Sequence, residues 1–258
     1  MLARMLELTA GRARVLIDVD AGGRLASLEV DGTELLVQRD PDVDDQMLWG
    51  SFPMAPYAGR VRDAGFRHRG AIHRLPVSLP PHAGHGTVWN QPWTITRSTQ
   101  ASAGLQCELG PDWPFGGTAA QSIELSDRAV RCELTLTASE RSMPAELGWH
   151  PWFREVTDLE VSATAMYERD ADGIPTGRLI DPPPPPWDDC FVVAAPTRLR
   201  VAGVDVTLDS DCDLRVVFDG LDIGVAVEPQ SGPPDAFHLA PRVLQPREML
   251  TRTMTIAW

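Results

Sequence analysis

Short segments of alternating apolar and polar residues, each ended by turn-forming residues, fill most of the sequence and limit the folds that it can adopt. Alternation with a period of two places apolar side chains on one face of a β-strand. No long segment shows the 3.6-residue period of an amphipathic helix, and 23 prolines and 21 glycines supply many turns. Many short strands separated by turns indicate a β-sandwich or a β-barrel. The sequence therefore predicts an all-β fold.

Strand-like segments run from near the start of the chain to its end. Alternating runs at residues 12–19 and 25–30 flank a glycine-containing turn, and Asp31 with Gly32 then gives a hairpin signal, so this part predicts a β-meander. No internal repeat and no change of composition divides the sequence, so we expect one domain over residues 1–258. Further strands are expected at residues 34–37, 93–98, 105–109, 119–125, 130–138, 159–162, 198–201, 204–208, 214–218, 223–228 and 249–258.

The charge of the chain limits its partners. The net charge is −13, and all 23 basic residues are arginines, which form no basic cluster. Such a chain is not expected to bind nucleic acid or an anionic membrane. Because the chain has no lysine, mechanisms that need a Schiff base or a phosphate-loop lysine are excluded. These features carry no prediction of an oligomeric state.

The four cysteines, Cys107, Cys132, Cys190 and Cys212, are widely spaced and form no C-x-x-C pair. Zinc-ribbon and thioredoxin-like sites are therefore excluded, and a disulfide framework is not expected in a chain of this length. The first residues lack the basic segment and the long apolar run of a signal peptide, and no run suits a membrane span. We therefore expect a cytoplasmic protein.

One stretch near the C-terminus, residues 225–238, combines a predicted strand with a carboxylate and a loop rich in proline and glycine. Alternation predicts the strand, and Pro229 is expected to end it because proline has no N–H for the ladder. Glu228 then lies at a strand terminus, at the mouth of whatever the sheet encloses. A solvent-exposed strand end is the simpler explanation for a single Glu, so a functional role depends on partners elsewhere in the chain.

Two further stretches place a guanidinium and imidazoles in loops. Arg60 follows an Ala-Gly pair, where its guanidinium could bind oxygen atoms or form a surface salt bridge. His82 and His85 lie three residues apart in a glycine-containing loop. No third ligand stands at a recognised metal spacing, so we expect these histidines to form hydrogen bonds and expect no metal site.

Two more stretches combine aromatic residues with a histidine or a carboxylate. His150 has a tryptophan on either side of it and precedes a proline, which favours an extended backbone. A packed core histidine is the alternative. Asp188 follows five prolines at residues 182–186, a stiff segment expected to deliver it to a fixed place. A simple turn is the alternative there.

Together these stretches supply carboxylates, imidazoles, a guanidinium and many aromatic residues. Aromatic surfaces suit the apolar C–H faces of a sugar, and polar groups can fix its hydroxyls. A carboxylate with an imidazole can serve as base and acid in proton transfer. The sequence contains no serine nucleophile elbow, no phosphate loop and no dinucleotide fingerprint. A small-molecule sugar is therefore the expected ligand.

The order and spacing of these stretches resemble the aldose 1-epimerase, or galactose mutarotase, family. Five segments resemble its motifs in order, from about residue 50 to the end of the chain, and their co-occurrence is more specific than any one of them. Residues 56–61, which contain Arg60, resemble the family's Asn-Arg-Ile motif, and His85 with Gly86 resembles its Leu-His-Gly motif. Residues 150–153 resemble Asn-His-Pro-Tyr-Phe, and residues 187–191 resemble aromatic-Asp-x-x-Phe. Residues 228–238 resemble Glu-Pro-Gln followed by Pro-Asp-Ala-x-Asn.

The resemblance implies a single antiparallel β-supersandwich domain, with the site in a cleft on its concave face and no metal or organic cofactor. The implied reaction interconverts the α and β anomers of an aldose. By this resemblance Glu228 is the base on the anomeric hydroxyl, His150 is the acid at the ring oxygen, and His85 is a second imidazole there. Glu228 is then expected to be ionised and His150 protonated near neutral pH. Expected substrate contacts are Arg60, Asp188, Trp149, His82 and Gln230.

Some positions depart from the family's pattern. Gly59, His82 and Trp149 stand where the family usually or often has Asn, so three amides that could bind sugar hydroxyls are missing. Hexose-6-phosphate mutarotases, a sister group, tend to carry an Arg four residues after the His-Gly histidine, and Trp89 occupies that position here. A phosphorylated sugar is therefore less expected, although Arg62 or Arg154 could substitute. The identity of the sugar stays open.

Two other functions also stay open. A non-catalytic sugar-binding or sensing protein on the same fold is consistent with the missing amides. A glycosidase or lyase that uses Glu228 with Asp188 needs two carboxyl groups at a set separation. Because a fold does not by itself transfer an activity, the isomerase hypothesis depends on Glu228 and His150 meeting in one site.

Overall fold

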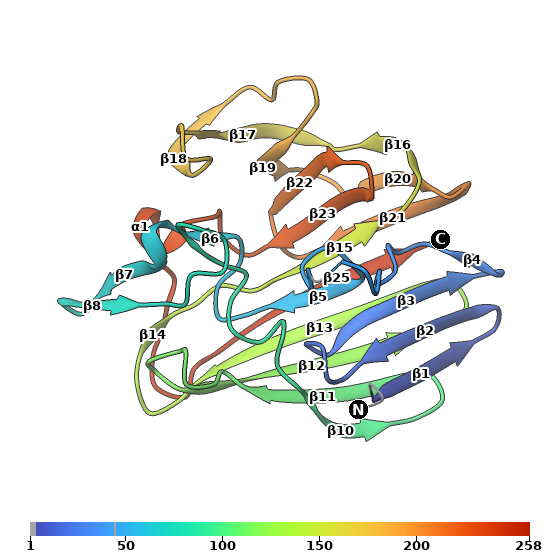
Figure 1. Cartoon of the computed structure of the whole chain (residues 1–258), viewed down its shortest axis with the longest axis horizontal. Coiled ribbons are helices and arrows are strands. Elements are labelled where there is room, and N and C mark those ends of the chain that lie inside the picture. Colours follow the sequence, from blue (N-terminus) through green and yellow to red (C-terminus); the bar gives the residue numbers. More distant parts are fainter. Residues whose placement is uncertain (1–3, 44) are drawn as a thin grey trace.

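Two large antiparallel sheets carry most of the computed structural model, which describes residues 4–43 and 45–258 (Figure 1). The first sheet contains, in spatial order, β1 (Met5–Ala10), β2 (Ala13–Asp18), β3 (Arg24–Val30), β5 (Ser51–Met54), β15 (Gly148–Phe153), β23 (Gly224–Gln230), β22 (Leu214–Leu221), β19 (Asp188–Val193), β17 (Ala163–Arg169) and β18 (Pro175–Ile180), and β4 (Thr33–Glu34) pairs with β3. The second contains β10 (Thr94–Ser98), β11 (Ser102–Glu108), β12 (Gly117–Leu125), β13 (Ala129–Ala138), β25 (Met249–Ala257), β21 (Val204–Ser210), β20 (Thr197–Val201) and β16 (Val156–Glu160).

Short elements lie beside these sheets. Three small pairs are β6 (Arg60–Val61) with β9 (Ala83–Gly84), β7 (Gly65–His68) with β8 (Ala71–Arg74), and β14 (Met143–Pro144) with β24 (Val243–Leu244). Helical structure in the described part of the chain consists of the 3-10 turn η1 (Arg62–Ala64) and the helix α1 (Ala236–Leu239). Among the described residues, no helix has the length and apolarity needed to cross a membrane. The all-β prediction is confirmed.

The two sheets pack against each other around one apolar core. Val15 and Leu28 of the first sheet and Ile123 and Leu134 of the second are fully buried and belong to the same cluster. Burial of apolar surface contributes roughly 25 cal/mol per Å², so this layer between the sheets is the main source of stability. Because side chains alternate along a strand, each first-sheet strand has a second face that points away from this core.

Nearly every predicted strand has an observed counterpart, with ends shifted by no more than three residues. Two expectations need correction. The strand expected at residues 159–162 lies earlier, at Val156–Glu160. Within residues 34–37 only Glu34 belongs to a strand, and Leu36 makes a single bridge to Phe153 beyond it.

Six strands of the first sheet were not predicted, namely β1, β5, β15, β17, β18 and β19. The reason is clearest in β15 and β5, where every residue is buried. A strand covered on both faces has no polar alternation to mark it. Prolines inside both strands weaken the local signal further.

The centre of the first sheet corrects the expectation for Pro229. Strand β23 does not end there; it continues to Gln230, and Pro229 pairs with Arg215 of β22. Strands β23 and β15 pair at Gly148–Gln230 and again at Trp152–Ala226, and the stretch between these pairs holds a proline on each strand. A proline is tolerated in an antiparallel ladder where the neighbouring strand receives no N–H from that residue. The two strands therefore stay in register across this stretch.

Arg24, at the start of β3, is a fully buried guanidinium. It donates hydrogen bonds to the backbone carbonyls of Ala21, Gln46, Trp49 and Trp89, and its Cζ lies 4.1 Å from the ring centroid of Trp49. Burial lowers the pKa of Arg24 to about 9. These bonds fix the loop that carries Gln46 and Trp49 to the first sheet.

Replacing Arg24 by Met is expected to lower the free energy of unfolding by about 3 kcal/mol, because four carbonyls lose their donor in a buried place. Denaturant unfolding measures this loss. Arg14→Met is the matched control, since Arg14 is exposed and pairs with Glu7 at the surface, and a change below about 0.5 kcal/mol is expected there. Equally small losses in the two variants contradict the anchoring role of Arg24.

Candidate active site

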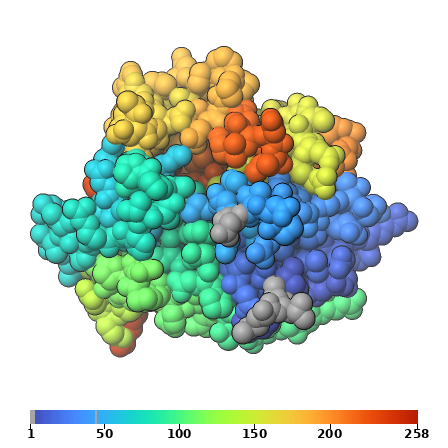
Figure 2. All heavy atoms as spheres, in the orientation of Figure 1, coloured from blue at the N-terminus to red at the C-terminus, as the bar shows by residue number. Residues whose placement is uncertain are grey.

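A cavity of about 140 Å³ lies on the face of the first sheet that points away from the core. Strands β15, β22 and β23 supply its floor, and loops from distant parts of the chain supply its rim. Figure 2 shows segments near residues 50 (blue), 85 (green) and 220 (orange) meeting on one face of the molecule. The apolar lining comes from Met47, Leu48, Leu79, Trp152, Val216 and Phe218.

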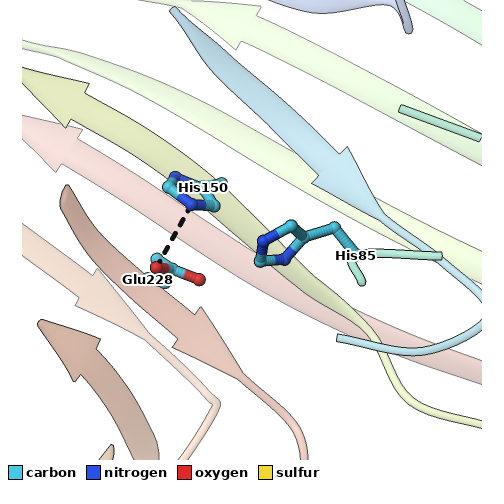
Figure 3. Close-up of side chains that lie close together, drawn as sticks. All are labelled: His85, His150 and Glu228. Atoms are coloured by element: carbon cyan, nitrogen blue, oxygen red, sulfur yellow. Dashed lines mark ion pairs between the residues drawn. The ribbon is translucent and has the colours of Figure 1, made fainter. Parts of the chain in front are cut away.

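His150 and Glu228 face each other at the floor of this cavity (Figure 3). Nε2 of His150 lies 3.3 Å from Oε1 of Glu228, and both side chains are almost fully buried. The strand register explains the contact, because the pairs on either side of it place these two residues opposite each other on the same face. The structure therefore brings together the residues predicted as base and acid.

Two aromatic rings hold the imidazole of His150 from its sides. Phe52, directly opposite on β5, stacks on it with ring centroids 4.7 Å apart, and Trp152, two residues along β15, stacks with centroids 5.4 Å apart. The indole N–H of Trp152 donates to the carbonyl of Met47 at 2.7 Å. This packing limits rotation of the imidazole and keeps Nε2 toward Glu228.

His85 enters the cavity from the loop after β9. Its backbone is left-handed, with φ 62°, and Gly86 follows with φ 82°, where a Cβ would lie 2.0 Å from the carbonyl oxygen of Ala55. The His85 ring meets that of His150 edge to face, with centroids 4.9 Å apart, and its Nδ1 lies 3.0 Å from Sδ of Met54. Because a thioether can only accept, Nδ1 carries the proton and Nε2 keeps a free lone pair.

Burial sets the protonation of these three groups. It raises the pKa of Glu228 to about 8, and the nearby charge of Asp188 acts in the same direction. Burial also lowers the pKa of His150 well below 6.5 and that of His85 to about 3. Both shifts favour the neutral form of the pair, with its proton on Glu228, because a buried ion pair costs more desolvation. The expectation of an ionised Glu228 beside a protonated His150 stays a prediction for the reacting pair.

Gln230 lies on the same face as Glu228, two residues further along β23. Its side chain is fully buried and lines the cavity, and its Nε2 donates to Oε2 of Glu228 at 2.9 Å. This hydrogen bond lowers the pKa of Glu228, against the larger effect of burial. Gln230 therefore positions one carboxyl oxygen while His150 contacts the other.

Arginines and aspartates form an ionic group at the edge of the cavity. Oδ2 of Asp188 lies 3.4 Å from Nη2 of Arg60 and 3.2 Å from Nη1 of Arg169, which reaches it from the neighbouring strand β17. Nε of Arg169 also contacts Asp189 at 2.7 Å. Arg60 and Asp188 both line the cavity and are about one third exposed, so both are available to a ligand.

Two predicted substrate contacts lie elsewhere. Trp149 is buried in the core between the sheets, where its indole N–H donates to Oε1 of Gln121 at 3.0 Å. This follows from strand alternation, because His150 points to the cavity. His82 is buried in its loop, and its Nδ1 accepts the backbone N–H of Asp63 at 3.1 Å. Neither side chain lines the cavity.

Several residues of the site were not singled out from the sequence. Trp152 could have been found, because it lies two residues from His150 on a strand and so shares its face. Phe52, Met54 and Arg169 carry no such local signal. Their roles come from the pairing of β5 with β15 and of β17 with β19, between segments far apart in the chain.

Nitrogen and oxygen atoms of His85, His150 and Glu228 all lie within 4.8 Å of one another. Two imidazoles and one carboxylate could in principle hold a divalent transition metal. The same groups also make a proton-transfer pair with a third hydrogen-bonding side chain. The expectation that the site works without a metal stays a prediction.

Comparison with known proteins identifies the family. The model of the aldose 1-epimerase family matches residues 4–255. The chain belongs to the aldose 1-epimerase family. No protein with a curated description matches the sequence.

Solved structures agree with this family. A putative aldose 1-epimerase from Escherichia coli K12 shares 19% identity over 98% of both chains, with a TM-score of 0.86. A galactose mutarotase-like protein from Clostridium acetobutylicum shares 17% identity over 98% of this chain and 94% of its own, with a TM-score of 0.85. An aldose epimerase homologue from C. elegans shares 14% identity over 99% of this chain and 98% of its own, also with a TM-score of 0.85. The expected galactose mutarotase-like fold is confirmed.

Replacing Glu228 by Gln is expected to change how stability depends on pH. Between its ordinary value near 4.5 and the raised pKa of about 8, the folded protein holds a proton on Glu228 that the unfolded chain has released. The stability due to this group is therefore present below pH ~4.5 and is lost as pH rises through ~8. The free energy of unfolding of the variant, relative to that of the parent, should therefore rise by about 1 kcal/mol or more between pH ~5 and pH ~8. Denaturant unfolding at each pH measures this difference.

The control for this measurement is Glu160→Gln, which changes an exposed carboxylate on β16. Its difference from the parent should stay nearly constant over the same pH range, because this side chain lies at the surface, where an ion pair contributes little to stability. A constant difference for the Glu228 variant as well contradicts a raised pKa at this residue.

Proposed function

We propose that this protein is an aldose 1-epimerase that interconverts the α and β anomers of an aldose by opening and closing the sugar ring. The observation that carries the proposal is the buried 3.3 Å contact between Glu228 and His150 at the floor of a partly aromatic cavity. Ring opening requires removal of a proton from the anomeric hydroxyl and delivery of one to the ring oxygen. A carboxyl group and an imidazole in contact can do both.

The proton shared by this pair gives it two forms. Desolvation favours the neutral form, with the proton on Glu228. Hydrogen bonds donated to the carboxyl by Gln230 and by the anomeric hydroxyl favour the charged form. Transfer across the 3.3 Å gap to Nε2 of His150 then yields a carboxylate and an imidazolium. The stacked faces of Phe52 and Trp152 are electron-rich and suit the imidazolium.

In the ring-opening step, Glu228 takes the proton of the anomeric hydroxyl while the bond between C1 and the ring oxygen breaks. His150 gives its proton to that oxygen, which leaves an open-chain aldehyde and a neutral pair. Rotation about the C1–C2 bond turns the other face of the carbonyl to the hydroxyl. On closure His150 takes the hydroxyl proton and Glu228 returns its proton to the carbonyl oxygen, so no proton is consumed overall.

His85 acts in this scheme as a neutral hydrogen-bonding group. Its lowered pKa of about 3 keeps the ring uncharged, and its Nδ1 is directed to Met54. The free lone pair on Nε2 can accept a hydroxyl proton of the sugar in a hydrogen bond. Arg60 and Asp188, at the edge of the cavity, are proposed to hold further hydroxyls.

The charges around the cavity favour a sugar without a phosphate. Arg62 contacts three carboxylates, and Arg154 pairs with Glu155 at the surface, so both arginines that could substitute are paired. The cavity lining also contains more carboxyl groups than guanidinium groups. A phosphate dianion would meet repulsion and paired arginines here. We therefore propose an uncharged aldose as the substrate.

The central test is polarimetry on freshly dissolved α-anomers of several aldoses. The protein should speed their relaxation to the anomeric equilibrium, and Glu228→Gln should reduce the enhancement by roughly 100-fold or more, because the base is lost. Sugar binding, measured by titration calorimetry, should persist in the variant. Glu160→Gln, an exposed change on β16, should keep the full rate.

The outcomes separate the parts of the proposal. Full activity in the Glu228 variant contradicts the assignment of the base. Faster relaxation of a 6-phosphate than of the free sugar contradicts an uncharged substrate. A parent protein that binds sugars but accelerates none of them contradicts the enzyme and favours the alternative below.

The pH dependence of kcat/KM is a second prediction. The pair works with one shared proton, which is lost as pH rises above the raised pKa of Glu228 near 8. After subtraction of the spontaneous rate, kcat/KM should therefore fall about tenfold per pH unit well above pH ~8. A value that keeps rising to pH ~10 contradicts a shared proton as the working form.

One observation favours an alternative, a sugar-binding protein without catalysis. Gly59 lines the cavity and offers no side chain, and the side chains of His82 and Trp149 lie away from it. The family's hydroxyl-binding amides thus have no counterpart at these three positions. Such a protein should bind aldoses and leave the rate of anomer exchange unchanged.

A further inference from the structure

The carboxylate of Asp188 is shared by two guanidinium groups that differ in how firmly they are held. Arg169 contacts Oδ2 of Asp188 through Nη1 at 3.2 Å and Oδ1 of Asp189 through Nε at 2.7 Å. Arg60 reaches the same Oδ2 through one nitrogen at 3.4 Å. A planar guanidinium fixed by two carboxylates has its orientation determined. Arg169 is therefore the permanent partner of Asp188, and Arg60 is the partner that can turn away.

The burial of Asp189 strengthens this distinction. The side chain of Asp189 is 5% exposed, and burial raises its pKa, while Arg169 is the charge that acts most strongly in the other direction. Withdrawal of Arg169 would leave a buried carboxyl group without its ion-pair partner, which is costly. Arg60 is under no such constraint, because its contact involves only the one-third exposed Asp188.

The strand that carries Arg169 is tied to the segment that carries Arg60. The turn after β17 begins at Asp170, and Arg62 contacts Asp170 at 2.5 Å and Asp172 at 3.3 Å. Arg60 precedes Arg62 by two residues. These ion pairs hold the β17–β18 hairpin beside the segment that carries Arg60.

We infer that Arg169 is a positioning residue, which holds the Asp188 carboxylate toward the cavity and leaves Arg60 free to bind substrate. Asp188 then accepts a hydrogen bond from one hydroxyl, and Arg60 donates one to the neighbouring hydroxyl oxygen. The chemical group recognised is a pair of adjacent hydroxyls on an uncharged sugar. The inference rests on the proposed function in taking the ligand to be a sugar.

The test compares Arg169→Met with the parent in sugar affinity and in rate. The affinity, measured by titration calorimetry with the aldose that the parent binds best, should fall about tenfold, as expected for a misplaced hydrogen bond to a charged group. For an active parent, KM should rise by the same factor and kcat should change less than about threefold, because the Glu228–His150 pair is untouched. Arg178→Met is the matched control, since Arg178 lies on the same hairpin and pairs with Glu168 at the surface.

A double-mutant cycle separates positioning from general support of the fold. In the Asp188→Asn background, Arg169→Met should lower the affinity further by less than about twofold, because the residue through which it acts is already changed. Arg169→Lys should recover only part of the affinity, because an ammonium cannot span both carboxylates as the guanidinium does. An equal loss of affinity in both backgrounds, full recovery with Lys, or an equal loss in the Arg178 control overturns the inference.

Because calorimetry measures sugar affinity without catalysis, the epimerase activity and the positioning role of Arg169 can be tested separately. A parent that binds sugar without accelerating anomer exchange contradicts the epimerase, yet the affinity cycle on Arg169 and Asp188 still decides the positioning role. Conversely, an active parent whose affinity is unchanged by Arg169→Met contradicts the positioning role and leaves the epimerase intact.

Discussion

The register between β15 and β23 is the constraint on which the site depends. Side chains alternate along a strand, so a shift of one residue would exchange the two faces. Trp149 would then point into the cavity and His150 into the core. The packing of Trp149 and Phe153 between the sheets prevents this shift. The same apolar layer that stabilises the sandwich therefore holds Nε2 of His150 3.3 Å from Glu228, and fold and site share one set of contacts.

Burial of the Glu228–His150 contact shifts the pKa values of both groups and also costs desolvation free energy. A carboxyl group and two imidazoles removed from water lose hydration, which drives all three toward their neutral forms. The surroundings offset part of this cost through the amide of Gln230, the rings on either side of His150 and the thioether beside His85. Because so few partners surround the pair, the balance between its two proton positions is sensitive to any hydrogen bond that a ligand adds.

The sequence predicted the all-β fold and the main polar residues of the cavity, because period-two alternation and short motifs are local signals. It failed where the information is not local. Strand β15 has no polar alternation, since both of its faces are buried, and Pro229, a residue type that predicts a strand end, lies inside β23. The stacking of Phe52 on His150 and the ion pair of Arg169 with Asp188 depend on pairings between strands distant in sequence. Composition and motif spacing do not predict these pairings.

The floor of the cavity lies on paired strands, whereas much of its rim lies on loops. Loops accept insertions and substitutions more readily than paired strands do. During divergence, the rim can thus change while the paired strands of the floor keep their register. An architecture built in this way can be retained at identities as low as the 14% to 19% seen here, because sequence change in its loops leaves the paired strands in place.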